Sequence, residues 1–324
     1  MKVHRRRFLL GVLCLFAASA PIKSFGQTPA FPSGPVKFIT PQAAGSGNDP
    51  AMRILADKLG KMWGHQIVLM NQPGAGGAIA LRSAAAAVPD GHTLFIAIAS
   101  TLTVLPVTEP DLSEKLNSFV PIGFVGEIPM GIAVSPQLPV NSLTELIELS
   151  KRQSAGLNAA VAFRGGMPDL ATELFRQRTG ANLNPIYYPG SVQAMSDVIM
   201  NRVPVIVDGL SGPVVTGGQV KLLAIASPAR PPSHPQVPTV SETVPGFTAS
   251  GWFVLLGPPG TPAWIVKKVN EDLRQALDQQ DVGEKFAALG VSTRAMSPEE
   301  LGDFIRSEQR LWKPVINRVG LAAQ

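Results

Sequence analysis

Residues 36–49 read VKFITPQAAGSGND, and residues 66–77 read QIVLMNQPGAGG. Each stretch is a short apolar run followed by a glycine-rich turn. After the first turn, Asp49 is a good helix N-cap and Pro50 suits the first helical position. After the second turn, an alanine-rich helix is predicted around residues 78–88. Apolar strands that alternate with helices predict a parallel sheet covered on both faces.

The same alternation continues along the chain. A third apolar strand is predicted at residues 92–99. A second series follows, with strands at 131–134, 158–163, 185–188, 203–207 and 220–226, and helices at 142–150, 169–178 and 191–200. Near the end, a strand at 252–256 precedes helices at 262–277 and 297–319, the last with a kink expected at Pro314. These elements predict an α/β fold of two lobes, each a mostly parallel sheet flanked by helices.

The order of the elements also predicts where the lobes divide. The first lobe is expected to take residues 27–128 plus 248–324, and the second lobe residues 129–247. The chain would then cross between the lobes twice, and such a double connection favours hinge closure over a ligand. We expect a monomer.

The first residues predict export from the cytoplasm. Arg5-Arg6-Arg7-Phe8-Leu9 is a charged start, an apolar stretch follows, and small residues occur near Gly26. This pattern is typical of a secretory signal peptide, here residues 1–26, and is too short for a permanent membrane span. It resembles the twin-arginine pattern, although ordinary signals look similar. The single cysteine, Cys14, lies inside the apolar stretch.

The charge of the mature chain argues against a nucleic-acid partner. Removing the five basic residues of the signal from the 28 of the whole chain leaves 23, equal to the 23 acidic residues. The basic pI therefore belongs to the signal peptide. A nucleic-acid-binding protein would be expected to carry clustered lysine and arginine on one face.

Four glycine junctions follow predicted strands, two in each lobe: Gly45-Ser46-Gly47, Gly74 to Gly77, Gly165-Gly166 and Gly190-Ser191. Neither of the two first-lobe junctions contains a cationic side chain. The free N–H groups and positive end of a helix bind an anion without one. The alternative is that glycine serves the turn sterically. Asp208 ends an apolar strand and faces either the cleft or a turn.

Catalytic and cofactor motifs are incomplete. Pro50 and Ile79 stand where a dinucleotide fingerprint needs its third glycine. Residues 209–213 miss a nucleophile elbow because of Pro213. His65, His92 and His234 lack metal-ligand partners at helical spacing. We expect no catalytic residue, no cofactor and no metal, and an exported α/β hydrolase or other enzyme is the alternative.

Several motifs in order resemble the Bug family, the extracytoplasmic substrate-binding receptors of tripartite tricarboxylate transporters. The resemblance covers essentially the whole mature chain. It is carried by Pro41-x-Ala43-Ala44-Gly45-x-x-Asn48-Asp49, Asn71-x-Pro73-Gly74-Ala75-Gly76-Gly77, Pro89-Asp90-Gly91-His92-Thr93-Leu94 and Gly257-Pro258-Pro259-Gly260-Thr261-Pro262.

The resemblance implies a non-enzymatic periplasmic protein with a two-lobed, type II-like Venus flytrap fold. It also implies a small organic acid or related solute as ligand, with membrane transporter subunits or a sensor as partner. One ligand carboxylate would bind between the first two loops, with further contacts from the second lobe. The implied binding residues are Ala43, Ala44, Gly45, Ser46, Asn48, Asp49, Gly74, Ala75, Gly76, Gly77, Gly165, Gly166, Gly190, Ser191 and Asp208.

The second lobe departs from the family pattern. Gly165-Gly166 replaces a glycine followed by serine or threonine, which removes a hydroxyl. Asp169 replaces a usual histidine, and Pro189 replaces the lysine of a Tyr-Lys-Gly turn, removing a cation and an N–H. Gly45-Ser46 stands where paired glycines are usual. We therefore expect specificity to reside in the second lobe.

Overall fold

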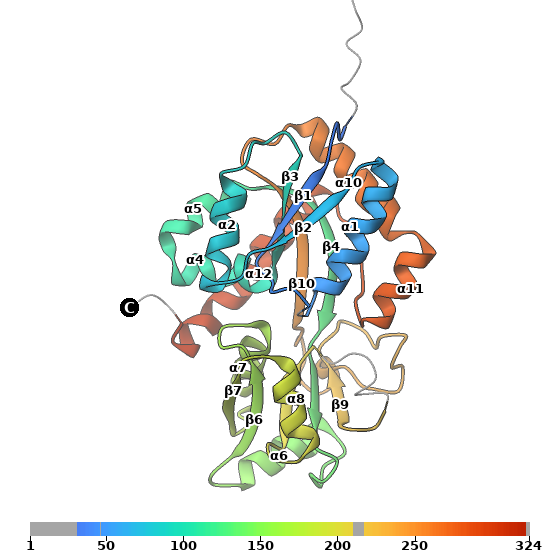
Figure 1. Ribbon diagram of the computed structural model, residues 1–324. Helices are drawn as coiled ribbons and strands as arrows, with labels where there is room; N and C mark the ends of the chain where they lie inside the picture. The colour runs from blue at the N-terminus through green and yellow to red at the C-terminus, as the bar shows by residue number, and fades with distance from the viewer. Residues whose placement is uncertain (1–30, 46, 210–216, 322–324) are drawn as a thin grey trace, which may run out of the picture. The chain divides into compact units, whose positions relative to one another are not determined.

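Two five-stranded sheets organise the chain in the computed structural model, which describes residues 31–45, 47–209 and 217–321 (Figure 1). The signal peptide predicted at residues 1–26 and the residue Ser46 lie outside the described residues. So does most of the predicted near-miss to a nucleophile elbow, because residues 210–216 are not described.

The first sheet has the strand order β2-β1-β3-β10-β4. Its strands are β1 (Val36–Thr40), β2 (Ile67–Asn71), β3 (Thr93–Ile98), β4 (Val120–Pro129) and β10 (Ser250–Gly257). β1 pairs in parallel with both β2 and β3, whereas β10 is antiparallel to β3 and β4. β10 is therefore the one strand of this sheet that is antiparallel to the others.

The second sheet repeats this plan with the order β7-β6-β8-β5-β9. Its strands are β5 (Gly131–Val134), β6 (Leu157–Ala162), β7 (Leu183–Tyr188), β8 (Val205–Asp208) and β9 (Lys221–Ile225). β6 is parallel to β7 and β8, and β5 is antiparallel to β8 and β9. β6 and β7 thus take the places that β1 and β2 have in the first sheet. We call the first sheet with its helices lobe 1 and the second lobe 2.

Helices cover both faces of the lobe 1 sheet. One face packs against α1 (Asp49–Trp63), α10 (Ala263–Leu277) and α11 (Gln280–Ala288), and the other against α2 (Ala78–Ala85) and α12 (Pro298–Val319). Neighbouring residues of β1 serve the two cores, since Phe38 packs with α1 and Ile39 packs with α2. This alternation explains why the strand is apolar on both sides.

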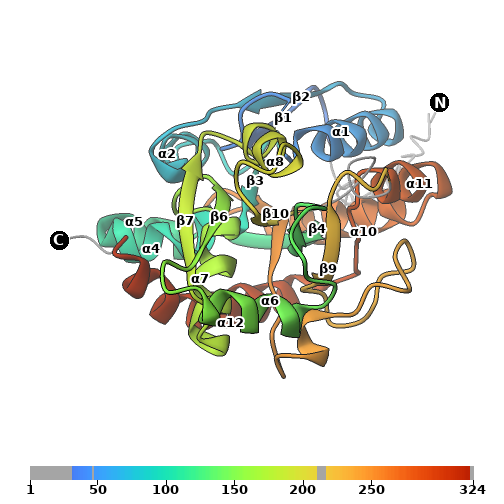
Figure 2. The ribbon, with the colours of Figure 1, turned by 90° about the horizontal axis from the view of Figure 1, so that it is seen from below.

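In lobe 2, α6 (Leu143–Arg152) and α7 (Met167–Thr179) share a core with Leu157 and Ala159 of β6. On the other face, α8 (Ser191–Ile199) packs with Ala160 and Ile206. The long helix α12 also contacts α7, and it lies alongside α7 when the ribbon is seen from below (Figure 2).

The chain passes between the sheets at β4–β5 and returns at β9–β10. Three backbone hydrogen bonds join these segments. The N–H of Met130 donates to Ala249 O at 2.9 Å, that of Ala226 to Met130 O at 2.7 Å, and that of Ala249 to Ala226 O at 3.0 Å. The two connections are therefore held together where they cross.

Most predicted strands and helices are present. Sequence patterns missed α3 (Ala99–Thr103), α4 (Leu105–Thr108), α5 (Pro110–Asn117), β4 and α11. The three helices α3 to α5 are too short to show a helical period, and α4 and α5 each have a proline at their first or second position. β4 carries prolines and glycines that weaken a strand pattern.

Candidate functional site

The β1–α1 junction is an exposed loop whose backbone carries the predicted ligand contacts. Ala43, Ala44 and Gly45 are exposed, whereas Asn48 is buried. Sequence reasoning was wrong by one residue about the helix start: Asn48 is the N-cap, and Asp49 is already helical. Asn48 makes no capping hydrogen bond through its side chain. The Asp49 carboxylate instead turns back toward the loop and accepts the N–H of Gly45.

Asp49 fixes the shape of this loop. Its carboxylate, 2% exposed, accepts hydrogen bonds from the N–H of Gly45 at 2.8 Å, from Arg53 Nε at 2.9 Å and from Asn71 Nδ2 at 2.8 Å. Burial alone would raise the pKa of Asp49, but these hydrogen bonds and the Arg53 charge outweigh it and hold the pKa below its ordinary value. Asp49 is therefore ionised at neutral pH. Its direct contact with a ligand stays a prediction.

The β2–α2 junction lies beside the first. Asn71, the last residue of β2, donates from Nδ2 to both Asp49 and Gln42 O, the latter at 3.0 Å. Gly74, Gly76 and Gly77 have φ values of 122°, 60° and 101°, which favour glycine. Gly74 to Gly76 are exposed, and no side chain caps the start of α2. The loop therefore presents backbone rather than side chains ahead of the helix.

Gly77 is buried beneath the next element. A Cβ on Gly77 would lie 2.4 Å from Thr101 Oγ1, so α3 leaves no room for a side chain there. Thr101 also donates a hydrogen bond to Gly76 O at 3.4 Å. This packing fixes the position of the second junction relative to α3.

The β6–α7 junction of lobe 2 repeats the first junction. The N–H of Gly165 donates to Asp169 Oδ2 at 2.8 Å, and Tyr187 of β7 donates its hydroxyl to Asp169 Oδ1 at 3.2 Å. Burial raises the pKa of Asp169 above its ordinary value, and the two hydrogen bonds offset this only in part. No side chain caps the start of α7.

The β7–α8 junction brings Gly190 and Ser191 to the same edge of the sheet. Ser191 is exposed at the first position of α8, and no side chain caps this helix start. The neighbouring Tyr188 is turned away, because its hydroxyl donates to Asp197 Oδ2 at 2.8 Å. Burial and this hydrogen bond raise the pKa of Tyr188 to about 12.

Asp208 ends β8 at this same edge and is 6% exposed. Its Oδ1 accepts the N–H of Gly209 at 2.7 Å. Its Oδ2 has no hydrogen-bond partner among the described residues, so the nearby Ser191 hydroxyl does not reach it with hydrogen-bond geometry. Burial raises the pKa of Asp208, and Ser191 and Gly209 only partly counter this.

Sequence reasoning missed Phe163, which lies between the two lobe 2 junctions. A Cβ on Gly166 would be 3.2 Å from Phe163 Cβ, and a Cβ on Gly190 would be 3.6 Å from Phe163 Cζ. Phe163 is 50% exposed and has a φ of 59°. The only sequence signal was a large aromatic residue directly before a cation and two glycines.

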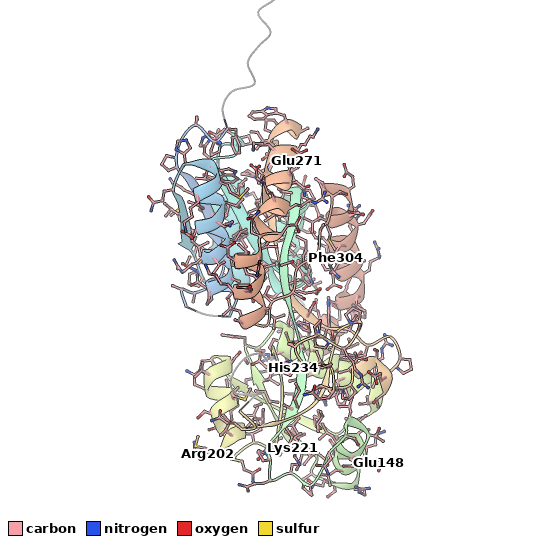
Figure 3. All side chains as sticks on the ribbon, turned by 90° about the vertical axis from the view of Figure 1, so that its right-hand side faces the viewer. Glu148, Arg202, Lys221, His234, Glu271 and Phe304 are labelled. Carbon is pink, nitrogen blue, oxygen red and sulfur yellow. The ribbon has the colours of Figure 1, made fainter. Side chains whose placement is uncertain are left out.

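The described residues contain no group of three histidine, cysteine, aspartate or glutamate side chains able to hold a metal ion. His65 follows α1, His92 precedes β3, and His234 lies in the connection between β9 and β10 (Figure 3). His65 and His92 therefore both lie near the start of β1, where the N–H groups of Val36 and Lys37 donate to Gln66 O and His92 O, whereas His234 belongs to the β9–β10 connection.

Two cavities lie away from most of the predicted contacts. One of about 240 Å³ is lined by residues of α7, β7 and the end of α12: Asp169, Glu173, Arg176, Pro185, Tyr187, Arg318 and Val319. Another, of about 20 Å³, lies beside β4 and α10. Neither is lined by residues of the lobe 1 junctions or by Gly190, Ser191 or Asp208.

Comparison with known proteins identifies the family. The profile described as "Tripartite tricarboxylate transporter family receptor" matches residues 51–321. The chain belongs to this receptor family. The resemblance to Bug-family receptors, drawn from the loop motifs, is thereby confirmed. Among relatives, the protein BugT of Bordetella pertussis is 33% identical over 317 residues, covering 96% of this chain and 97% of BugT.

Solved structures similar to this chain have the same fold. The periplasmic binding protein BugD is 30% identical, with a TM-score of 0.77, covering 91% of this chain and 100% of BugD. Rpa4515 of R. palustris, solved with adipate, is 27% identical, with a TM-score of 0.80 and coverage of 91% and 100%. The predicted two-lobed periplasmic-binding-protein fold is confirmed. Among the described helices, none is long and apolar enough to span a membrane.

Proposed function

We propose that this receptor captures a small carboxylate in the periplasm and delivers it to the membrane subunits of a tripartite transporter. The observation that carries the proposal is the pair of lobe 1 junctions. Asn71 ties them together, and α1 and α2 each begin without a side-chain cap. The positive ends of two neighbouring helix starts without side-chain caps are suited to one carboxylate.

The electrostatics of lobe 1 favour backbone recognition. Arg53 is the cation beside the first junction, and its guanidinium already contacts Asp49 and Asn71 Oδ1, the latter at 3.0 Å. A ligand carboxylate would therefore be held by the backbone of the two loops, Ala43 to Asp49 and Gly74 to Gly77, in which the N–H groups of Gly45 and Gly77 already donate to Asp49 and to Gly74 O. The positive ends of α1 and α2 would stabilise the negative charge.

Lobe 2 would close over the ligand with Gly165, Gly166, Gly190, Ser191 and Asp208. The β4–β5 and β9–β10 connections, joined at Met130, would act as the hinge. We propose lobe boundaries at 27–128 plus 248–324 and 129–247, which the strand membership of the two sheets supports. In this account the receptor is a monomer that catalyses no reaction, exported through a signal peptide cleaved near residue 26, with the twin-arginine route as one candidate.

A thermal-shift screen of the mature chain against mono-, di- and tricarboxylates tests the carboxylate assignment. A ligand that binds only the folded state raises the melting temperature as its concentration exceeds Kd. At least one carboxylate should do so. A response to neutral or cationic solutes alone would contradict the proposal.

Gly76 offers a matched pair of variants. Gly76 is exposed with a φ of 60°, and a Cβ there would meet only Leu105 Cδ2 at 3.5 Å. Asparagine and aspartate both tolerate this backbone region, so both variants should fold. Gly76→Asp should weaken binding about a hundredfold through like-charge repulsion, and Gly76→Asn less than about tenfold. Equal effects would place the carboxylate elsewhere.

The hydrolase alternative gains no support from the family or the described residues. Incubation of the mature protein with candidate esters and amides should give no turnover. Turnover abolished by a single substitution would instead establish an enzyme.

A further inference from the structure

The lobe 2 side of the proposed site carries an aromatic surface. Phe163 is half-exposed at the carboxyl end of β6. Two backbone hydrogen bonds hold its turn, from the Phe163 N–H to Tyr188 O at 3.1 Å and from the Gly166 N–H to Phe163 O at 2.9 Å. Its ring extends toward Gly190 at the start of α8. The ring therefore occupies the space between two junctions that the proposed function assigns to the ligand.

A second exposed apolar side chain of lobe 2 belongs to the first turn of α8. Val192, the second residue of α8, is 80% exposed. In lobe 1, Ile79 is the second residue of α2 and is 49% exposed. Both helix starts thus place an apolar side chain next to the backbone N–H groups, and exposed apolar side chains grouped at a site favour apolar contact with a ligand.

The buried carboxyl group of Asp208 disfavours a second anion. Its Oδ2 is buried and has no described partner, beside the α8 start at Ser191. When Asp208 is ionised, its carboxylate only accepts hydrogen bonds and matches a donor or an uncharged group. A second ligand carboxylate would then set two acceptors and two negative charges against each other.

Arg164, the cation of the β6–α7 junction, lies on the face of the lobe 2 sheet opposite to α8. Successive side chains of β7 point to opposite faces. Tyr188 contacts Asp197 of α8, whereas Tyr187 contacts Asp169 of α7. The guanidinium of Arg164 lies 5.7 Å above the Tyr187 ring, and thus on the α7 face. It is separated from the surface formed by Phe163 and Val192.

We propose that the ligand carries a single carboxylate, held by lobe 1, and an apolar body that lies against Phe163 and Val192 of lobe 2. The preferred substrates are then monocarboxylates with an aliphatic or aromatic body, rather than di- or tricarboxylates. This inference rests on the proposed function and adds the chemical class of the substrate.

Hexanoate and adipate form a matched pair of probes, because they share a six-carbon chain and differ by one carboxylate. Calorimetric titration of the mature protein, with phenylacetate as an aromatic third probe, should give at least one monocarboxylate a Kd about tenfold or more below that of adipate. Tighter binding of adipate would overturn the inference and leave the proposed function intact. No binding of these probes, or of any acid in the wider carboxylate panel, would overturn both.

Substitutions in lobe 2 test the same preference from the protein side. Phe163→Asn removes the ring, and asparagine suits a positive φ. The variant should raise the Kd of the tightest-binding monocarboxylate about tenfold and change the Kd of adipate little. Phe163→Leu should keep the preference. Asp208→Asn should lower the ratio of the adipate Kd to the monocarboxylate Kd about tenfold, because the amide offers a hydrogen-bond donor.

Arg164→Ala is the control, and it should leave the preference unchanged. Circular dichroism and melting temperature verify that each variant folds. If Phe163→Asn weakens all acids equally, the ring shapes the loop rather than contacting the ligand, and the inference is wrong. If Arg164→Ala abolishes binding of adipate alone, lobe 2 holds a second carboxylate, which also overturns it.

Discussion

Asp49 and Asp169 occupy the same position in the two lobes, and each accepts a hydrogen bond at 2.8 Å from the N–H of the glycine four residues earlier. Each also accepts a hydrogen bond from the neighbouring edge strand, from Asn71 in lobe 1 and from Tyr187 in lobe 2. The residue one turn later differs, because lobe 1 has Arg53 and lobe 2 has Glu173. Burial is the main cause that raises the pKa of Asp169, and the Glu173 charge adds to it, whereas hydrogen bonds and the Arg53 charge outweigh burial and lower the pKa of Asp49.

Asp49→Asn should destabilise the protein. The amide loses the Arg53 ion pair and points an N–H₂ at one of its former donors, which should lower the free energy of unfolding by about 1–3 kcal/mol at pH 7. A group with a lowered folded-state pKa contributes stability above its unfolded pKa and loses it as the pH falls through its folded pKa. Urea denaturation should therefore show the variant's deficit shrinking below pH 3.8, the ordinary pKa of this group. A deficit that does not change with pH would contradict the ionic role of Asp49.

Asp169→Asn should have the opposite effect on stability at pH 7. A carboxyl group with a raised folded-state pKa contributes its stability below its unfolded pKa and loses it as the pH rises through its folded pKa. At pH 7 the wild type therefore carries the cost of a buried charge. The asparagine still accepts from Gly165 and donates to the Tyr187 oxygen, so the variant should be as stable as wild type or more stable by about 1 kcal/mol.

The two variants form a matched pair, measured by the same urea titration at pH 7 and near pH 3. The advantage of Asp169→Asn should disappear in acid. If Asp169→Asn instead loses as much stability at pH 7 as Asp49→Asn, the lobes do not differ in the way their charges indicate.

The sequence predicted the strands that carry the junctions because each is a short apolar run next to glycine, as β1 and β2 illustrate. It also contained the spacing Gly45–Asp49 and its repeat Gly165–Asp169, but nothing local says that the carboxylates bend back to those glycines. The position of Phe163 could not be predicted, since its ring reaches Gly190 only through the pairing of β6 with β7. Tertiary packing, rather than local propensity, decides such positions.

Gly77→Ala should disturb the second junction through two separable effects. A φ of 101° strains any L-residue, and the new Cβ would clash with Thr101 Oγ1. Together these should cost about 2–4 kcal/mol in urea denaturation. Adding Thr101→Ala removes the two shortest contacts but leaves the strain and a contact with Pro41 Cβ at 3.2 Å, so the double variant should recover about half of the loss. If adding Thr101→Ala to Gly77→Ala recovers no stability, backbone strain alone explains why residue 77 is glycine.

Glu308→Ala should loosen the attachment of α12 to lobe 1. Oε2 of Glu308 accepts the indole N–H of both Trp252, at 2.7 Å, and Trp312, at 3.0 Å. Both tryptophans are fully buried, and the rings of Trp252 and Phe304 pack at a centroid distance of 5.1 Å. Phe304 lies on α12, one turn before Glu308 (Figure 3). Alanine leaves two buried donors without a partner and should cost about 2–4 kcal/mol.

Glu308→Gln keeps an oxygen with two lone pairs and should cost less than about 1 kcal/mol. Denaturation followed by tryptophan fluorescence measures both, and equal losses would show that the negative charge, rather than hydrogen bonding, secures the helix.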